Sequence, residues 1–387
     1  MKHPATGTDH CEAPFGSNAV RLSPGEWVIA LGLTCALMYV IPTLWQRIEP
    51  FQPGPDDRLP YRLSNDYWTA ARRFRQASSE QATLVLGDSV VWGHYVGPRE
   101  TLSHYLSERG GGEQFANLGV DGIHPAALAG LVEHYGRGLS KRNVVLHCNL
   151  LWMSSKRYDL QVKKEFPFNH PRLVPQFFPW IPCYKESLSG RIGIVVGRNV
   201  PFFGWASHLQ TAYFANTDLP TWTIEHPYAN PASAVTLELP SPEEPPSPEP
   251  VAEPWTAKGI AKFNPSWVEL ATSFQWASFA KTVEILRRRG NRVFVLVGPF
   301  NEHMLTEKSL KVYEERKREA EAWLRENEIP YAIPPALPSE YYADASHPLS
   351  EGYSLLAGQL LRNEPFVRFL NGGGARRGSR PRRERLR

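Results

Sequence analysis

Three residues in two short segments carry the side chains that serine acyl transfer requires. TLVLGDSVVWG, residues 83–93, places Ser89 two residues after a glycine that ends an apolar run. YYADASHPLSEGY, residues 341–353, holds Asp344 and His347 three residues apart, so that a single turn can direct both side chains to one place. A serine attacks an acyl carbon when a histidine takes its proton and a carboxylate orients that histidine. Taken singly, the segments equally suit a helix-capping Ser, a capping Asp and a surface His.

Acyl transfer also needs hydrogen-bond donors for the developing oxyanion, and two further segments offer them. In NLGVDG, residues 117–122, Gly119 can present its backbone N–H without side-chain obstruction. In HCNLL, residues 147–151, Asn149 can offer its side-chain amide, and His147 lies on the same face of an extended strand. The alternatives are a turn glycine, a strand-ending Asn and a satisfied polar His.

A third loop and the cofactor question complete the candidate chemistry. GPFNEHML, residues 298–305, offers Glu302 and His303 as substrate-lining residues or as an alternative base; an ordinary connection into the next helix is the other interpretation. The four Cys show no CxxC spacing, and no Walker loop or dinucleotide fingerprint occurs. We therefore predict no metal and no cofactor.

The elements around these residues alternate between strand and helix. Apolar runs predict strands over 83–86, 115–118, 143–148, 292–297 and 329–333. Periodic segments predict helices over 65–78, 101–109, 125–136, 265–289, 306–327 and 351–362. This alternation predicts an α/β fold with a doubly wound parallel sheet. The candidate residues follow the strands, at the carboxyl edge where open α/β sheets place their sites.

In the order Ser, Gly, Asn, Asp-x-x-His, the four blocks resemble the SGNH hydrolase superfamily, also called GDSL esterases/lipases. The resemblance covers about residues 83–149 and 292–362, and it implies a flavodoxin-like SGNH fold. It implies that Ser89 is the nucleophile, His347 the general base and Asp344 the residue that orients it. It also implies an oxyanion hole formed by Ser89 N–H and two further donors, namely Gly119 N–H and the Asn149 amide.

Other positions of the motif match, and one block departs. Gly93 satisfies the GDSxxxG spacing, and the run after His347 is matched by Pro348, Gly352 and Tyr353. In the third block, His147 replaces the usual Gly and Leu150 the usual Asp. This departure bears on the shape of the pocket, and hence on the substrate, more than on the mechanism.

The N-terminal part of the chain predicts a membrane anchor. Residues 27–45, WVIALGLTCALMYVIPTLW, carry no charge and as a helix would span about 28 Å, with Trp27 and Trp45 as interfacial residues. A buried core helix and a cleaved signal peptide are the alternatives. The count of Arg flanking the span argues against an exported C-terminal domain. The resemblance to anchored relatives implies the opposite, an extracytoplasmic catalytic domain on a single-pass anchor.

The remaining segments complete the predicted organisation. Eleven aromatic residues between Phe166 and Phe214 form either the core of an inserted subdomain or a lid, membrane-facing or partner-facing surface. The expected division is a polar segment 1–26, the anchor 27–45, a stalk 46–64, a hydrolase domain 65–153 and 265–371, an insertion 154–264 with a disordered Pro/Glu-rich loop 240–254, and a disordered basic tail 372–387.

Three functions remain open from the sequence. The first is a serine ester hydrolase acting through an acyl-serine on an ester that is carbohydrate-linked. The second is an O-acyltransferase of an envelope or exported polysaccharide, beside a membrane-bound acyltransferase, as in the anchored relatives that this chain resembles. The third, a non-catalytic envelope scaffold, would predict a broken triad. The tail accounts for the positive net charge of +4, so the body gives no reason to expect nucleic-acid binding.

Overall fold

The computed structural model describes residues 22–54, 57–80 and 82–372. Its centre is a sheet of five parallel strands in the order β2-β1-β3-β4-β5. These strands are β1 (Thr83–Gly87), β2 (Phe115–Gly119), β3 (Asn143–Cys148), β4 (Arg292–Val297) and β5 (Tyr331–Ala332). The sheet confirms the predicted α/β class and is consistent with a flavodoxin-like fold, in which sites lie at the β1/β3 switch point.

The strands are buried on both faces, and their side chains alternate between two apolar cores. Leu84 and Leu86 of β1 face one core, and Val85 between them faces the other. The first core is covered by α2 (Tyr67–Ser79), α5 (Pro125–His134), α10 (Phe274–Arg288) and α11 (Glu307–Glu326). The second is covered by α4 (Leu102–Arg109), α12 (Ser350–Arg362) and α13 (Glu364–Asn371). The sheet is therefore doubly wound, as predicted.

Two helices begin later than predicted, because a side chain caps each of them. Helix α2 begins at Tyr67 and not at residue 65, because the Asp66 side chain caps it and accepts from Thr69 N. Helix α10 begins only at Phe274, because the Ser273 side chain caps it, and residues 265–269 form no helix. Helix α13 was not predicted, and β5 is shorter than expected. Short helices complete the fold: η1 (Tyr61–Leu63), α3 (Ser89–Trp92), η2 (Pro98–Glu100), η3 (Leu150–Met153), η4 (Leu270–Thr272), η5 (Glu302–Met304) and η6 (Ser339–Tyr341).

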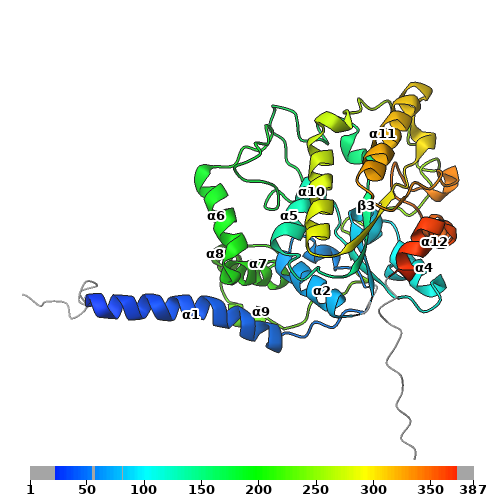
Figure 1. The fold of residues 1–387 in the computed structure, drawn as a ribbon. Coiled ribbons are helices and arrows are strands. Elements are labelled where there is room, and N and C mark those ends of the chain that lie inside the picture. The colour runs from blue at the N-terminus through cyan, green and yellow to red at the C-terminus, as the bar shows by residue number, and fades with distance from the viewer. Residues whose placement is uncertain (1–21, 55–56, 81, 373–387) are drawn as a thin grey trace, which may run out of the picture.

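Helix α1 (Pro24–Ile48) carries the predicted span and extends beyond it at both ends. By length and composition it is the one helix of the described residues able to cross a membrane, and its apolar side chains are mostly exposed. Ser23 and Glu26 form a capping box that fixes its start. In Figure 1, α1 points away from the body of the molecule.

The insertion has long irregular stretches on either side of its helices. It contains α6 (Leu188–Asn199), α7 (Pro201–Tyr213), α8 (Leu219–Glu225) and α9 (Pro231–Ala234). Residues 240–254 form neither helix nor strand, and Pro242 O accepts a hydrogen bond from Arg58 Nε at 3.3 Å. Disorder of this loop stays a prediction. The predicted tail falls, apart from Gly372, outside the described residues, as does most of the predicted polar segment 1–26.

A buried polar network joins α1, α2 and the insertion. His208 of α7 places its Nε2 2.8 Å from Glu49 Oε1 and its Nδ1 2.7 Å from Asp66 Oδ2. Glu49 also accepts from Arg72 and, at 2.5 Å, from the Tyr213 hydroxyl. Burial lowers the pKa of His208, but the two carboxylates outweigh it and raise that pKa to about 9. A buried imidazolium between two carboxylates therefore fixes the end of α1 to the domain.

Candidate active site

Ser89 lies where β1 turns into the short helix α3, at the switch point of the sheet. Asp88 caps α3, and its side chain accepts from Val90 N at 3.0 Å. At Gly87 a Cβ atom would lie 2.6 Å from Val91 Cγ2 and 2.7 Å from the His147 Cβ, so only glycine fits this turn. Ser89 itself is 8% exposed, so its hydroxyl lies at the base of the site.

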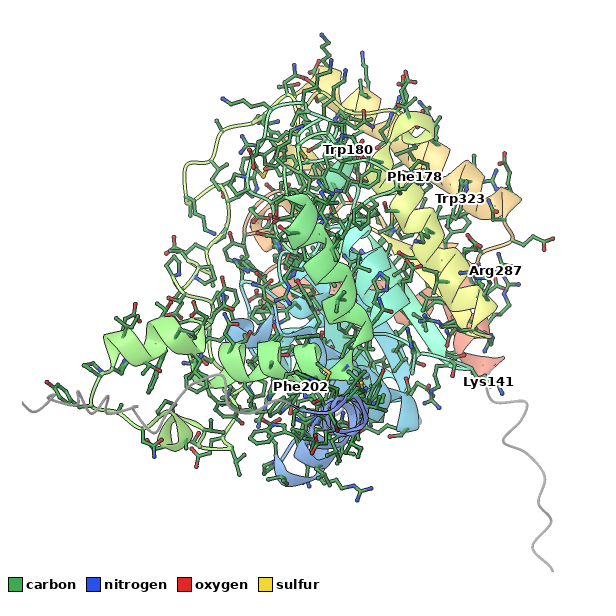
Figure 2. All side chains as sticks on the ribbon, turned by 90° about the vertical axis from the view of Figure 1, so that its left-hand side faces the viewer. Lys141, Phe178, Trp180, Phe202, Arg287 and Trp323 are labelled. Atoms are coloured by element: carbon green, nitrogen blue, oxygen red, sulfur yellow. The ribbon has the colours of Figure 1, made fainter. Side chains whose placement is uncertain are left out.

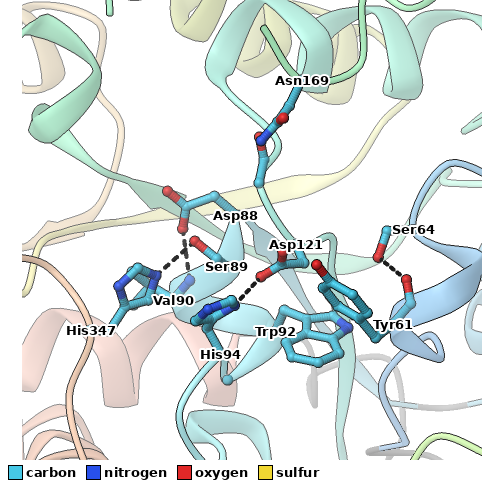
Figure 3. Close-up of polar contacts among 12 residues, drawn as sticks. Tyr61, Ser64, Asp88, Ser89, Val90, Trp92, His94, Asp121, Asn169 and His347 are labelled. Carbon is cyan, nitrogen blue, oxygen red and sulfur yellow. Dashed lines mark hydrogen bonds and ion pairs between the residues drawn. The ribbon is translucent and has the colours of Figure 1, made fainter. Parts of the chain in front are cut away.

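The structure brings the three predicted catalytic residues together. His347 Nε2 lies 2.8 Å from Ser89 Oγ, a contact drawn in Figure 3. On the other side of the ring, Nδ1 lies 2.8 Å from each carboxylate oxygen of Asp344. The backbone N–H groups of Ser346 and His347 donate to Asp344 Oδ1 at 2.9 and 3.0 Å. This geometry suits a nucleophile, a base and a residue that orients the base.

The charges of the site favour a protonated His347. Burial lowers the pKa of His347, but the carboxylate of Asp344, with smaller contributions from Asp88 and Asp121, raises it above its ordinary value. Burial raises the pKa of Asp344, yet the adjacent imidazole and the N–H donors hold it well below its usual range. Asp344 is thus ionised, and it stabilises the imidazolium that proton transfer from Ser89 would form.

Asp88, the residue before Ser89, is the centre of a second buried cluster. Its carboxylate lies 3.1 Å from His147 Nδ1 and accepts from Asn149 Nδ2 at 2.8 Å and Trp152 Nε1 at 3.0 Å. Burial raises the pKa of Asp88, but His147 and the donors outweigh it and lower that pKa to about 2. His147 is buried against this carboxylate, which argues against the substrate-lining role predicted for it. Asn149 keeps a second amide N–H that the cluster does not use.

Gly119 has a packing role in this structure. Its N–H donates to Asn117 Oδ1 at 3.0 Å, which argues against its predicted place in an oxyanion hole. A Cβ at Gly119 would lie 2.3 Å from Trp92 N, so glycine lets β2 approach α3. Among the residues that the structure describes, no acceptor is found for the N–H of Ser89 or of Gly122. Gly122 was not predicted as a donor from the sequence, because the conformation of the turn after β2 could not be read from residue types.

The loop after β4 reaches the triad through a residue other than those predicted. Glu302 pairs with Lys317 at 2.7 Å, and His303 Nε2 lies 3.0 Å from Leu337 O, so both are engaged elsewhere. Asn301 instead donates from Nδ2 to Asp344 O at 3.0 Å and from its backbone N–H to Ala345 O at 2.8 Å. It therefore holds the loop that carries Asp344.

A second His–Asp pair borders the triad. His94 Nδ1 lies 2.7 Å from Asp121 Oδ1, and the His94 ring centroid lies 5.5 Å from that of His347. The Tyr95 ring lies equally far from His347, and Lys258 Nζ lies 4.2 Å above Tyr95. In the sequence, the position of His94 directly after the GDSxxxG block is the one sign of this pair.

Asp121 also forms part of the wall of a cavity of about 420 Å³. Figure 3 shows Tyr61, Ser64 and Asn169 near the Asp121 side of the site. The cavity is mostly polar, with two aromatic rings; its remaining lining includes Arg62, Asn65, Phe168, His170, Thr211 and Asn216. We call this cavity the polar groove. A larger cavity of about 820 Å³, lined by Arg292, Lys317 and Tyr331 among others, lies beside β5 and includes no residue of the triad.

The predicted stalk packs onto helix α3, which begins at Ser89. Arg58 is buried, and its Nη1 donates to Gly93 O at 2.6 Å and Val96 O at 2.8 Å, at the carboxyl end of α3. Its guanidinium carbon lies 3.8 Å from the centre of the Trp92 ring, and Trp92 Nε1 donates to Leu59 O. A cation at the carboxyl end of a helix satisfies its free carbonyls. Arg58 therefore helps to fix the turn that presents Ser89.

Comparison with known proteins adds no assignment. No protein-family model matches the chain, and no curated protein matches its sequence. Within residues 22–54, 57–80 and 82–372, no group of three or more His, Cys, Asp or Glu side chains is placed to hold a metal ion.

Proposed function

We propose that this chain is a serine ester hydrolase of the SGNH type, with Ser89 as nucleophile, His347 as general base and Asp344 as the residue that orients it. The observation that carries the proposal is the continuous contact from Ser89 Oγ through both ring nitrogens of His347 to Asp344. The resemblance of the sequence blocks to GDSL esterases supports the same roles. A non-catalytic scaffold would have no need of this arrangement.

The proposed reaction has two half-reactions. His347 Nε2 accepts the Ser89 proton while Oγ bonds to the acyl carbon, and the carbonyl oxygen becomes an oxyanion. Ser89 N–H and the free N–H of Asn149 are the donors proposed for that oxyanion, and Gly122 N–H is a further unengaged donor. When the tetrahedral intermediate collapses, the ester C–O bond breaks and His347 returns the proton to the leaving alcohol. Water, activated by His347, then releases the acid and restores Ser89.

The polar groove supports an alcohol portion rich in hydroxyl groups, such as a carbohydrate. Side-chain amides of Asn65, Asn169 and Asn216 with the rings of Tyr61 and Phe168 offer hydrogen bonds and flat apolar faces together. A groove of this kind can equally hold a sugar that accepts the acyl group in place of water. O-acyl transfer to an envelope polysaccharide is therefore the second candidate, with a membrane-bound acyltransferase as the partner that supplies the acyl group.

The proposed location is a single-pass membrane protein with an extracytoplasmic catalytic domain. Helix α1 supports the span by its length and apolar composition. Protease protection on right-side-out vesicles tests the orientation, because an extracytoplasmic domain is digested and a cytoplasmic one is shielded. Shielding would overturn the orientation without bearing on the triad.

A fluorophosphonate probe on the full-length chain in detergent tests the function. We expect labelling of the wild type and none of Ser89→Ala or His347→Ala. Ser79→Ala and His226→Ala are matched controls, because both residues are exposed and lie outside the site, and they should label normally. A folded wild type that does not label would overturn the proposed triad. With labelling in hand, mono-O-acetyl disaccharides supplied with and without a sugar acceptor separate hydrolysis from transfer.

A further inference from the structure

Helix α6 of the insertion turns a row of apolar side chains toward the outside of the molecule. Leu188, Ile192 and Val196 are spaced four residues apart and lie on its exposed side, with 68%, 49% and 42% of their surface accessible. The small residues Ser189 and Gly193 lie between them and are also exposed. A helix at a protein–water boundary normally turns its apolar stripe inward, so this outer stripe requires another environment.

The two arginines of α6 turn toward the segment of the insertion that precedes the helix. Arg191 is buried and donates to Tyr184 O at 2.8 Å, to Glu186 O at 3.1 Å and to Gln176 O. Arg198 donates from Nη2 to Val174 O at 2.7 Å. Both arginines of α6 thus bind backbone carbonyls of residues 174–186, and the exposed stripe of α6 carries no charged side chain.

Aromatic side chains extend the apolar stripe. Phe178 is 90% exposed and Trp180 is 58% exposed. The Arg191 guanidinium lies 4.9 Å from the Trp180 ring, which places Trp180 beside α6. Lys185 is exposed, with Nζ 5.9 Å from the same ring. Exposed Trp and Phe beside a Lys are typical of protein surfaces in the head-group region of a bilayer.

The position of α1 indicates which surface covers this stripe. The rings of Trp45, at the end of the predicted span, and Trp205 of α7 lie 5.8 Å apart, and α6 packs on α7. Figure 1 shows α1 leaving the body on the side of α6, which runs across the direction of α1 and not along it. In Figure 2 that side of the molecule faces the viewer. Helices α6 and α7 lie at the front, and Phe178 and Trp180 are labelled.

We propose that the outer face of α6, with Phe178 and Trp180, lies in the head-group and upper acyl region of the bilayer that α1 enters. The proposal rests on α1 spanning that bilayer, and it is independent of the catalytic assignment. The buried network of Glu49, Asp66 and His208 ties α1 to α7, so the angle between anchor and domain is set by packed residues. An interfacial helix typically sinks about 5–10 Å into the boundary.

Depth-dependent fluorescence quenching in lipid nanodiscs tests the proposal on the full chain. Cys11 and Cys35 are replaced by Ser, whereas Cys148 and Cys183 are buried and remain. An environment-sensitive fluorophore is attached to Ile192→Cys, to Leu33→Cys within α1, or to Lys311→Cys, an exposed position on α11. The lipids carry a nitroxide either near the head group or in the middle of the acyl chain.

We expect the fluorophore at Ile192→Cys to be quenched by the head-group nitroxide, at Leu33→Cys by the mid-chain nitroxide, and at Lys311→Cys by neither. Adding Leu188→Glu should reduce quenching at Ile192→Cys, because a carboxylate would draw α6 out of the lipid. If Leu33→Cys is quenched and Ile192→Cys is no more quenched than Lys311→Cys, the proposal is overturned and the anchor stands. If Leu33→Cys is not quenched, the anchor on which it rests fails as well. Water-exposed emission at Ile192→Cys would likewise overturn the proposal, because the stripe would then face water.

Discussion

The imidazole rings of His94 and His347 lie side by side, with their centroids 5.5 Å apart and each ring bonded through Nδ1 to its own aspartate. Only His347 reaches Ser89. The carboxylate of Asp121, which binds His94, nevertheless contributes to the raised pKa of His347. Three carboxylates thus raise the pKa of the proposed base: Asp344 in contact with the ring, Asp88, and Asp121 across the neighbouring His94 ring.

Asp344→Asn should move the pH profile of ester hydrolysis to lower pH. A general base works when it is neutral, so wild-type activity should rise with pH through a His347 pKa that lies above the ordinary value. Without the carboxylate that stabilises the imidazolium, burial lowers the pKa of His347, and the rising limb of the pH profile moves to lower pH. The plateau kcat should fall by about 10³–10⁴-fold because the imidazole is no longer held in the productive tautomer. Glu351→Gln, an exposed acid near His347 in sequence, is the control; an unmoved limb would contradict the assignment.

Asp121→Asn should show how a carboxylate that makes no contact with His347 affects the pKa of that residue. Its carboxylate lies near His347 without bonding to it, so the rising limb should move to lower pH by less than in Asp344→Asn, with kcat within about tenfold of wild type. Because Asp121 also lines the polar groove, KM for a mono-O-acetyl disaccharide should rise while KM for ethyl acetate stays unchanged. Asp121→Glu keeps the charge and should restore the limb. Equal changes in KM for both esters would show that the groove does not hold the alcohol portion.

Asn149→Ala should lower kcat by about 10²–10³-fold, the usual effect of removing one oxyanion donor. The Asn149 amide also donates to Asp88, so loss of that bond will lower stability to some extent. Asn143→Ala at the opposite end of β3 is the matched control, since its side chain meets Arg292 far from the site. Thermal unfolding measured beside kcat separates the two effects. An unchanged kcat in a folded Asn149→Ala variant would remove Asn149 from the proposed mechanism.

Local patterns predicted the parts of this molecule that local interactions determine. Strands β3 and β4 begin and end where the apolar runs do, and the residues after β1 and before α12 supplied Ser89, Asp344 and His347. What the sequence missed are contacts between distant segments. Nothing near Arg58 indicates that it caps α3, and His94 and Asp121 belong to different loops.

Where the prediction of site residues fell short, competing hydrogen bonds and an ion pair were the cause. Gly119 follows a strand as an oxyanion donor should, but the Asn117 side chain takes its N–H. Glu302 and His303 border the right loop, yet Lys317 and the Leu337 carbonyl engage them. Lys317 and Leu337 lie on other segments, and the Asn117 side chain bonds within its own strand. Residue type and spacing alone reveal none of these partners.

His208→Gln should weaken the attachment of α1 and remove part of the pH dependence of stability. The folded pKa of His208 is about 9 against 6.5 for an ordinary His. Stability from this charge is therefore fully present below pH 6.5 and is lost as the pH rises through about 9. The difference in pKa corresponds to about 3 kcal/mol of unfolding free energy.

Thermal unfolding of the full chain in detergent at pH 6 and pH 9.5 measures this effect. The wild type should lose more stability between the two pH values than His208→Gln. At pH 6 the variant should be less stable by about 3–5 kcal/mol, because Glu49 and Asp66 stay buried without their cation. His226→Gln, at an exposed histidine of the same insertion, is the control and should behave as the wild type does. Equal losses between pH 6 and pH 9.5 in the wild type and in His208→Gln would show that His208 is not charged in the folded protein. The packing of α1 against α7 would then depend on its apolar contacts, chiefly those of Trp45 and Trp205, and on the hydrogen bond from Tyr213 to Glu49.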